Sequence, residues 1–198
     1  KREAVTLTFF GDGAARQGSL HETLTMAVKW NLPVVFCIEN NGYAMGTSVA
    51  RTAKNTEIWK LGLGYDMPCG PVDAMNPVKV AEAMDEAISR ARKGDGPTLL
   101  ELKTYRYRGH SMSDAQLYRT KDEVAEYQKI DPITQVRDII KENKYATDKE
   151  IKEIDKRVKD LVEECEKFAD ESDFPDLNVM YDTVYAQEDY PFLQHKVE

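Results

Sequence analysis

Two short apolar runs, separated by an amphipathic segment, constrain the fold more than any other feature of this chain. The runs are AVTLTFF at 4–10 and PVVFCIE at 33–39, and each has the length of one buried strand. Residues 19–30 between them carry apolar side chains at helical spacing, and Ser19 and Glu22 have the spacing of a capping box. Strand, helix and strand joined by short links form a βαβ unit with parallel strands. The sequence therefore predicts an α/β fold built on a parallel sheet.

The alternation of helix and strand continues beyond this unit. Asn76 and Pro77 begin a predicted helix that runs to about residue 92, and a further strand is expected over 98–104. The GDG at 94–96 falls between that helix and that strand. Because it precedes a strand, it lies at the wrong end of the sheet for a ligand site, and it indicates only a turn.

The last third of the chain has a helical pattern. We expect helices over 121–130 and 132–143. A second capping-box spacing, Thr147 and Glu150, predicts a long amphipathic helix to about residue 170. A short strand is expected over 179–185.

Charge is spread unevenly along a chain of net charge −8. Residues 1–120 carry 15 Lys and Arg against 13 Asp and Glu, whereas residues 121–198 carry 12 against 22. With the change to a helical pattern, this predicts an α/β domain over 1–130 and a helical extension with an acidic tail over 131–198. An acidic extension argues against nucleic acid and an anionic membrane as partners.

Other classes of protein are excluded by what the chain lacks. No apolar run approaches the roughly 20 residues that cross a bilayer. Cys37, Cys69 and Cys165 are far apart and have neither disulfide-framework nor zinc-site spacing. The first residues do not resemble a signal peptide. We therefore expect a cytoplasmic protein, or a mitochondrial matrix protein whose presequence is gone.

Polar residues with adjacent glycines follow the first two predicted strands. Gly11-Asp12-Gly13 comes after the first, and Asn40-Asn41-Gly42 after the second. Parallel strands end at one edge of a sheet, where ligands bind, so Asp12 and Asn41 are expected close together. Their oxygens suit Mg²⁺ that is shared with phosphate groups. Each motif alone is also compatible with a plain turn.

Three longer stretches carry a family resemblance. GDGAARQG, ENNGYAMGTSVAR and TYRYRGHSMSD resemble the alpha subunit of two-component, thiamine-diphosphate-dependent pyruvate dehydrogenase E1 enzymes. The resemblance runs from about residue 5 to at least residue 131 and is weaker beyond. It implies that the sheet is part of a thiamine-diphosphate-binding domain of the diphosphate type. Such relatives have a long preceding segment, so the resemblance implies an N-terminally truncated subunit, inactive alone and weak in binding the cofactor.

The resemblance also assigns a cofactor site. It implies that Asp12 and Asn41 bind Mg²⁺ through their side chains and Tyr43 through its backbone carbonyl. Gly13 and Ala14 are implied to contact the diphosphate.

The stretch TYRYRGHSMSD is implied to form a loop over the cofactor. His110 matches a catalytic histidine that hydrogen-bonds the diphosphate or the reacting intermediate, and so also contacts the cofactor. Six residues are implied to order this loop: Arg106, Tyr107, Ser111, Asp114, Tyr118 and Arg119. Ser111 matches a serine that animal kinases phosphorylate, but Leu117 replaces another such serine, and the loop is one residue shorter. These departures from the animal sequences favour a bacterial origin over control by a kinase.

The implied activity is the oxidative decarboxylation of pyruvate with transfer of the acetyl group to a lipoyl arm. The implied partners are a beta subunit, in an assembly of two alpha and two beta chains, and the lipoyl domain of dihydrolipoyl acetyltransferase. The beta subunit is expected to supply the glutamate that activates the cofactor. The alternatives are an acetoin or branched-chain 2-oxo acid dehydrogenase alpha subunit, or an inactive fragment that serves as an interaction module.

Overall fold

The computed structural model describes residues 4–182, which divide into two compact units after Asn143. The residues over 131–143, which we had grouped with the helical extension, therefore share contacts with the first unit. The division of the chain into functional domains at residue 130 stays a prediction.

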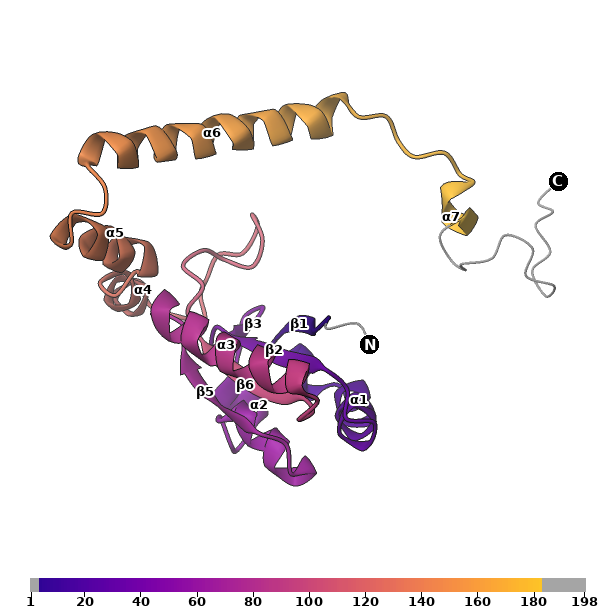
Figure 1. The fold of residues 1–198 in the computed structure, drawn as a ribbon. Helices are drawn as coiled ribbons and strands as arrows, with labels where there is room; N and C mark the ends of the chain where they lie inside the picture. Colours follow the sequence, from indigo (N-terminus) through magenta and orange to yellow (C-terminus); the bar gives the residue numbers. More distant parts are fainter. Residues whose placement is uncertain (1–3, 183–198) are drawn as a thin grey trace. The chain divides into compact units, whose positions relative to one another are not determined.

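The first unit is built on a parallel sheet of four strands (Figure 1). The strands are β1 (Thr6–Gly11), β2 (Val34–Asn40), β5 (Cys69–Asp73) and β6 (Thr98–Lys103). Their order in space is β1-β2-β6-β5, and every neighbouring pair is parallel. The three strands predicted from apolar runs are confirmed to within two residues at each end. β5 was not expected because CGPVD contains a glycine and a proline, which strands accept at the border of a sheet.

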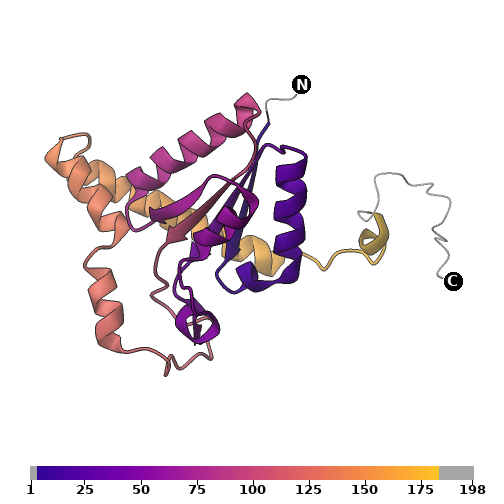
Figure 2. The ribbon, with the colours of Figure 1, turned by 90° about the horizontal axis from the view of Figure 1, so that it is seen from below.

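Helical segments cover both faces of this sheet (Figure 2). One face packs against α1 (Gly18–Lys29) and the 3-10 helix η2 (Ile58–Tyr65), and the other against α3 (Pro77–Lys93). The fully buried members of the first core are Leu24, Ile38, Ile58 and Leu99. Full burial of one such side chain contributes about 1.5–3 kcal/mol, so these two cores hold the strand ends in place.

β1 forms a border of the sheet. In the described part of the chain it pairs only with β2. Leu7 and Phe9 share one face of the strand, and Phe9 is 54% exposed there. The border strand is thus less covered than the central strands β2 and β6.

The two predicted capping boxes have opposite outcomes. α1 begins at Gly18 with Gln17 as its N-cap and with no side-chain cap, so the box at Ser19 is wrong. The short 3-10 helix η1 (Ala14–Arg16) leads directly into α1, and Ser19 therefore already lies inside the first turn. The box at Thr147 is confirmed, with hydrogen bonds in both directions between Thr147 and Glu150.

Short elements connect the strands on the carboxyl side of β2. They are β3 (Tyr43–Ala44), β4 (Thr47–Ser48) and α2 (Val49–Thr52), and β3 and β4 form an antiparallel hairpin. None was predicted because elements of two to four residues have no hydrophobic period. Two predicted helices follow β6, α4 (Lys121–Gln128) and α5 (Pro132–Glu142).

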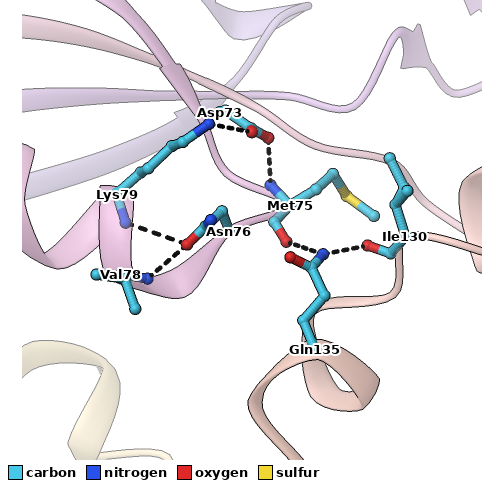
Figure 3. Close-up of polar contacts among 7 residues, drawn as sticks. All are labelled: Asp73, Met75, Asn76, Val78, Lys79, Ile130 and Gln135. Carbon is cyan, nitrogen blue, oxygen red and sulfur yellow. Dashed lines mark hydrogen bonds and ion pairs between the residues drawn. The ribbon is translucent and has the colours of Figure 1, made fainter. Parts of the chain in front are cut away.

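Polar contacts fasten α5 to the turn between β5 and α3 (Figure 3). Gln135 Nε2 donates hydrogen bonds to the carbonyls of Met75, at 2.9 Å, and Ile130, at 2.7 Å. Asn76 caps α3, as predicted, by accepting from the backbone N–H groups of Val78 and Lys79. These bonds explain why α5 belongs with the sheet unit.

The second unit contains α6 (Asp148–Glu171) and the short helix α7 (Val179–Asp182). α7 shows that the predicted strand over 179–185 is wrong in its described part, and residues 183–185 lie outside the described residues. The Asp176 side chain accepts from the Asn178 N–H, and its carbonyl from the Val179 N–H, so a local turn begins the helix. Within residues 4–182, we find no helix long and apolar enough to cross a membrane.

Candidate functional site

Asp12 and Asn41 lie at the same edge of the sheet. β1 ends at Gly11 and β2 at Asn40, and Gly11 is opposite Glu39 in the register of the two strands. Because the strands are parallel and adjacent, the next residues along each chain leave the sheet side by side. The prediction that both motifs lie at the carboxyl edge of the sheet is therefore confirmed, and the pairing of the Asp12 and Asn41 side chains at one cation stays a prediction.

Asp12 is a buried carboxyl group, with 5% of its surface exposed. Burial raises the pKa of Asp12 above its ordinary value, because the charged form loses water. Its own backbone N–H and the charges of Arg106 and Arg16 act in the opposite direction. A carboxylate held in this way is stabilised by a cation that replaces the lost water.

Gly13 allows a close approach between two parts of this edge. A Cβ atom added at Gly13 would lie 2.8 Å from Ala44 Cβ, which is closer than such atoms come in proteins. The backbone of Gly13 is right-handed helical, at φ −66° and ψ −46°, so space and not conformation requires glycine here. The turn after β1 therefore packs directly on the β3–β4 hairpin.

The turn after β2 is held by its own side chains. Asn41 Oδ1 accepts from the Tyr43 N–H at 3.2 Å, and Asn40 Oδ1 accepts from the Gly42 N–H at 3.0 Å. Gly42 has φ +86°, a left-handed conformation that favours glycine. The sequence motif thus forms a turn, and because this turn lies at the carboxyl edge of the sheet, its residues are also candidates for binding a ligand.

A buried carboxylate lies behind this turn. Glu101 is fully buried in β6, and its Oε1 accepts from Asn40 Nδ2 at 2.6 Å. Its Oε2 accepts from the Trp59 N–H at 3.0 Å. Neither Glu101 nor its bond to Asn40 was predicted from the sequence. The available signal was a glutamate in the otherwise apolar strand centre TLLEL.

Arg106 joins the loop after β6 to the hairpin. Its Nη2 donates to the Met45 carbonyl at 2.7 Å and to the Tyr118 hydroxyl at 2.9 Å. Its Nη1 lies 3.5 Å from the Tyr43 carbonyl, the oxygen that the resemblance assigns to the metal. The structure therefore places Arg106, Tyr43 and Tyr118 together, and the charge of Arg106 also acts on the Asp12 carboxyl group.

Asp114 organises the loop that carries His110. Its carboxylate accepts from the N–H groups of His110, at 2.7 Å, and Gln116, at 2.8 Å, and from the Tyr118 hydroxyl at 2.8 Å. The backbone N–H groups of His110 and Gln116 are the main cause of a lowered Asp114 pKa. The His110 side chain is exposed, so the loop presents it to solvent.

Arg119 supports the same loop from its other end. Its Nη2 donates to the carbonyls of Tyr107 and Arg108, both at 3.0 Å. Its guanidinium also lies over the Tyr105 ring, 5.2 Å from the centroid. Arg119 therefore contacts the loop backbone on two sides.

The other two predicted loop residues have separate surroundings. The Tyr107 hydroxyl donates to Asp131 Oδ2 at 3.0 Å, in the direction of α5. Ser111 is exposed, with its Oγ 3.1 Å from Ser113 Oγ. Neither side chain takes part in the contacts around Arg106.

A pocket of about 340 Å³ opens at the carboxyl ends of β2 and β6. Its polar lining includes Asn41, Tyr43, Tyr105 and Glu123. The hydroxyls of Tyr43 and Tyr105 both donate to Glu123 Oε1 at 2.8 Å. Burial, followed by the bond to Glu123, raises the pKa of Tyr105 to about 12. α4, which carries Glu123, is therefore tied to both the hairpin and the loop.

The ligand types at this edge limit its metal chemistry. Among the described residues, no group of three or more His, Cys, Asp and Glu side chains could hold a metal ion. Cys37 is buried in the core, and it is a free thiol like Cys69 and Cys165. A cation at this edge would be held by oxygens of a carboxylate, an amide and the backbone.

A parallel α/β sheet with an acid, an amide and close-packed glycine at its carboxyl edge defines the class of α/β proteins that bind a ligand there. Within this class the comparison with known families is specific. The chain belongs to the dehydrogenase E1 component family, whose model matches residues 1–178.

Curated relatives agree with this assignment. The chain is similar to the "Pyruvate dehydrogenase E1 component subunit alpha" of Rhizobium meliloti (strain 1021), at 46% identity over 89% of this chain and 51% of the relative. The corresponding subunit of Rickettsia felis is 44% identical over 92% of this chain and 56% of the relative. The chloroplastic "Pyruvate dehydrogenase E1 component subunit alpha-3" of Oryza sativa is 46% identical over 92% of this chain and 43% of the relative. The chain thus spans about half the length of the curated relatives it matches.

Proposed function

We propose that this chain is the part of a pyruvate dehydrogenase E1 alpha subunit that holds Mg²⁺ and the diphosphate of thiamine diphosphate. The observation that carries the proposal is the position of Asp12 and Asn41 directly after two adjacent parallel strands, at the same edge of the sheet. Membership of the dehydrogenase E1 component family and the names of the curated relatives support it.

The residues present fit these groups. Asp12 is a carboxylate largely removed from water, and the Asn41 amide and the Tyr43 carbonyl offer two further hard oxygens. Mg²⁺ prefers oxygen ligands and commonly takes one or two carboxylates with phosphate oxygens. At Gly13 the backbone has no side chain that would shield it from an anion.

The cofactor, when bound, supplies the electron sink for decarboxylation. The residues of this chain bind and orient it. Asp12, Asn41 and Tyr43 would hold Mg²⁺, and Gly13 and Ala14 would contact the diphosphate through the backbone.

His110 is proposed to donate a hydrogen bond to the diphosphate or to the reacting group. The contacts of Asp114 with the His110 N–H and of Arg106 with the hairpin support this, since they fix the loop from which His110 projects. Tyr107, Tyr118 and Arg119 would order the same loop, and Ser111 lies at its exposed tip.

The proposed substrate is pyruvate, and the acetyl group would pass to the lipoyl domain of dihydrolipoyl acetyltransferase. The proposed partner is a beta subunit in an assembly of two alpha and two beta chains, because an E1 alpha subunit implies one. A bacterial cytoplasm or a mitochondrial matrix stays the predicted location.

Calorimetric titration of the full-length assembled enzyme tests the site. Asp12→Ala is expected to abolish Mg²⁺-dependent binding of thiamine diphosphate, whereas the control Asp85→Ala, an exposed position on α3, should bind as the unchanged protein does. Normal binding by Asp12→Ala would overturn the proposal. The 198-residue chain alone is expected to bind the cofactor weakly and to be inactive.

A decarboxylation assay distinguishes the proposed enzymatic role from the alternative, a fragment that serves as an interaction module. Activity of the assembled enzyme should be lost with Asp12→Ala. Full activity of that variant would favour a chain whose contribution is contact with partners alone.

A further inference from the structure

A chain of three hydrogen bonds, which includes the buried Glu101 carboxylate, connects the core to the turn after β2. The Trp59 N–H donates to Glu101 Oε2, and Glu101 Oε1 accepts from Asn40 Nδ2. Asn40 Oδ1 then accepts from the Gly42 N–H at 3.0 Å. Glu101 accepts at both of its oxygens, so the bonds connect the 3-10 helix η2 through β6 to Gly42, the residue between Asn41 and Tyr43.

A fully buried carboxylate is an unusual group for the centre of a sheet. Its transfer from water costs several kcal/mol unless donors satisfy its oxygens. Glu101 stands between Leu100 and Leu102 in β6, where an apolar side chain would avoid this cost. What the carboxylate provides is two acceptor oxygens on one rigid strand, one for the core and one for the turn.

The bond to Glu101 also determines the orientation of the Asn40 amide. Its Nδ2 must face the carboxylate, so its Oδ1 faces the Gly42 N–H. Gly42 is the left-handed residue at which the chain reverses. Its placement decides where Asn41 and the Tyr43 carbonyl project.

We propose that Glu101 is a positioning residue for the metal site: acting through Asn40, it fixes the turn that presents Asn41 and the Tyr43 carbonyl to the cation. This rests on the proposed function, because the cation is the one that Asp12 would share. Glu101 itself does not touch the metal. Loss of such supporting hydrogen bonds typically weakens metal binding about 10- to 100-fold.

An exchange of the amide at position 40 and the carboxylate at position 101 tests whether Glu101 acts through Asn40. Glu101→Gln alone places two amides together, and either orientation of the Asn40 amide leaves one donor facing another. Asn40→Asp alone places two carboxylates together. In the double variant N40D/E101Q the new aspartate accepts from both the Gly42 N–H and the new glutamine amide, whose oxygen accepts from the Trp59 N–H. The double variant thus restores all three bonds and the net charge.

The measurement is binding of Mn²⁺, in place of Mg²⁺, to the full-length assembled enzyme in the presence of thiamine diphosphate, followed by electron paramagnetic resonance of the free ion. Each single variant should bind Mn²⁺ about 10- to 100-fold more weakly, and the double variant should return to within about threefold of the unchanged enzyme. Urea unfolding of the same samples shows how much of each is folded. If Glu101→Gln does not fold, Asn40→Ala interrupts the same chain of bonds while Glu101 keeps its bond to Trp59.

The outcomes distinguish this inference from the proposed function. Normal Mn²⁺ binding by folded Glu101→Gln, with binding lost in Asp12→Ala, would overturn the positioning role alone. Weak binding by a folded double variant would also overturn it. Normal binding by Asp12→Ala would overturn the proposed function and the inference with it.

Discussion

Gly13 is the position at which one added methyl group has the largest predictable effect on the site. In Gly13→Ala the new Cβ would lie 2.8 Å from Ala44 Cβ, so the turn after β1 and the β3–β4 hairpin must separate. Overpacking of this kind costs typically 1–3 kcal/mol. Alanine also reduces the conformational freedom of the unfolded chain, which stabilises the folded protein by about 0.4–1 kcal/mol, because alanine adopts the Gly13 backbone conformation without strain. The net expected destabilisation is about 1–2 kcal/mol.

A double-mutant cycle in urea unfolding measures this contact directly. Ala44→Gly removes the atom that the new Cβ meets, so the two substitutions should couple by about 1 kcal/mol or more in the free energy of unfolding. Gly18→Ala is the matched control, since a Cβ there has no atom within 4 Å. The control should be neutral or more stable by up to about 1 kcal/mol.

Two results would refute the steric reasoning. One is a Gly13→Ala protein as stable as the Gly18→Ala control. The other is additivity of the substitutions at 13 and 44, which would mean that the two turns do not touch in solution.

Further predictions concern charge, the loop and the helices. Asp12→Asn should stabilise the cofactor-free chain at neutral pH, because burial raises the Asp12 pKa and the charged form therefore destabilises the fold. The increase in the free energy of unfolding, measured in urea, should shrink as the pH falls from the raised folded-state pKa toward 3.8, because Asp12 then becomes protonated. Asp114 has a lowered pKa, so its stabilisation of the loop is present above 3.8 and is lost as the pH falls through the folded value, which limited proteolysis should detect as faster cleavage. Glu123→Gln replaces the acceptor of two phenols, among them that of Tyr105, and should speed hydrogen exchange in α4. Thr147→Ala removes a cap worth about 1 kcal/mol and should lower the helical circular dichroism of α6 on heating.

The sequence was informative where periodicity and strand order decide the outcome. Apolar runs located β1, β2 and β6, and the βαβ rule placed Asp12 and Asn41 at one edge because parallel topology leaves no other arrangement. The helix spacing after Asn76 and the box at Thr147 also gave elements that the structure has. These features depend on residues close in sequence.

Contacts between distant residues could not be predicted in this way. The bond of Asn40 to Glu101 spans 61 residues and that of Tyr43 to Glu123 spans 80, and no local pattern specifies either pair. At Ser19 the capping residues were present, but the 3-10 helix η1 precedes α1, and Gln17, two residues before Ser19, occupies the N-cap position. The strand expected at 179 had β-branched and aromatic residues but became a turn of helix, in which the N–H groups of Asn178 and Val179 donate hydrogen bonds to Asp176.

The border strand β1 has a practical consequence for work with this chain. Among residues 4–182, β1 pairs on one side alone and Phe9 is half exposed on its face, and such a strand is a template onto which another polypeptide can add. We expect preparations of the 198-residue chain to self-associate with rising concentration. A lysine introduced at position 9 should keep them dispersed, since a charge on an outer strand opposes such additions.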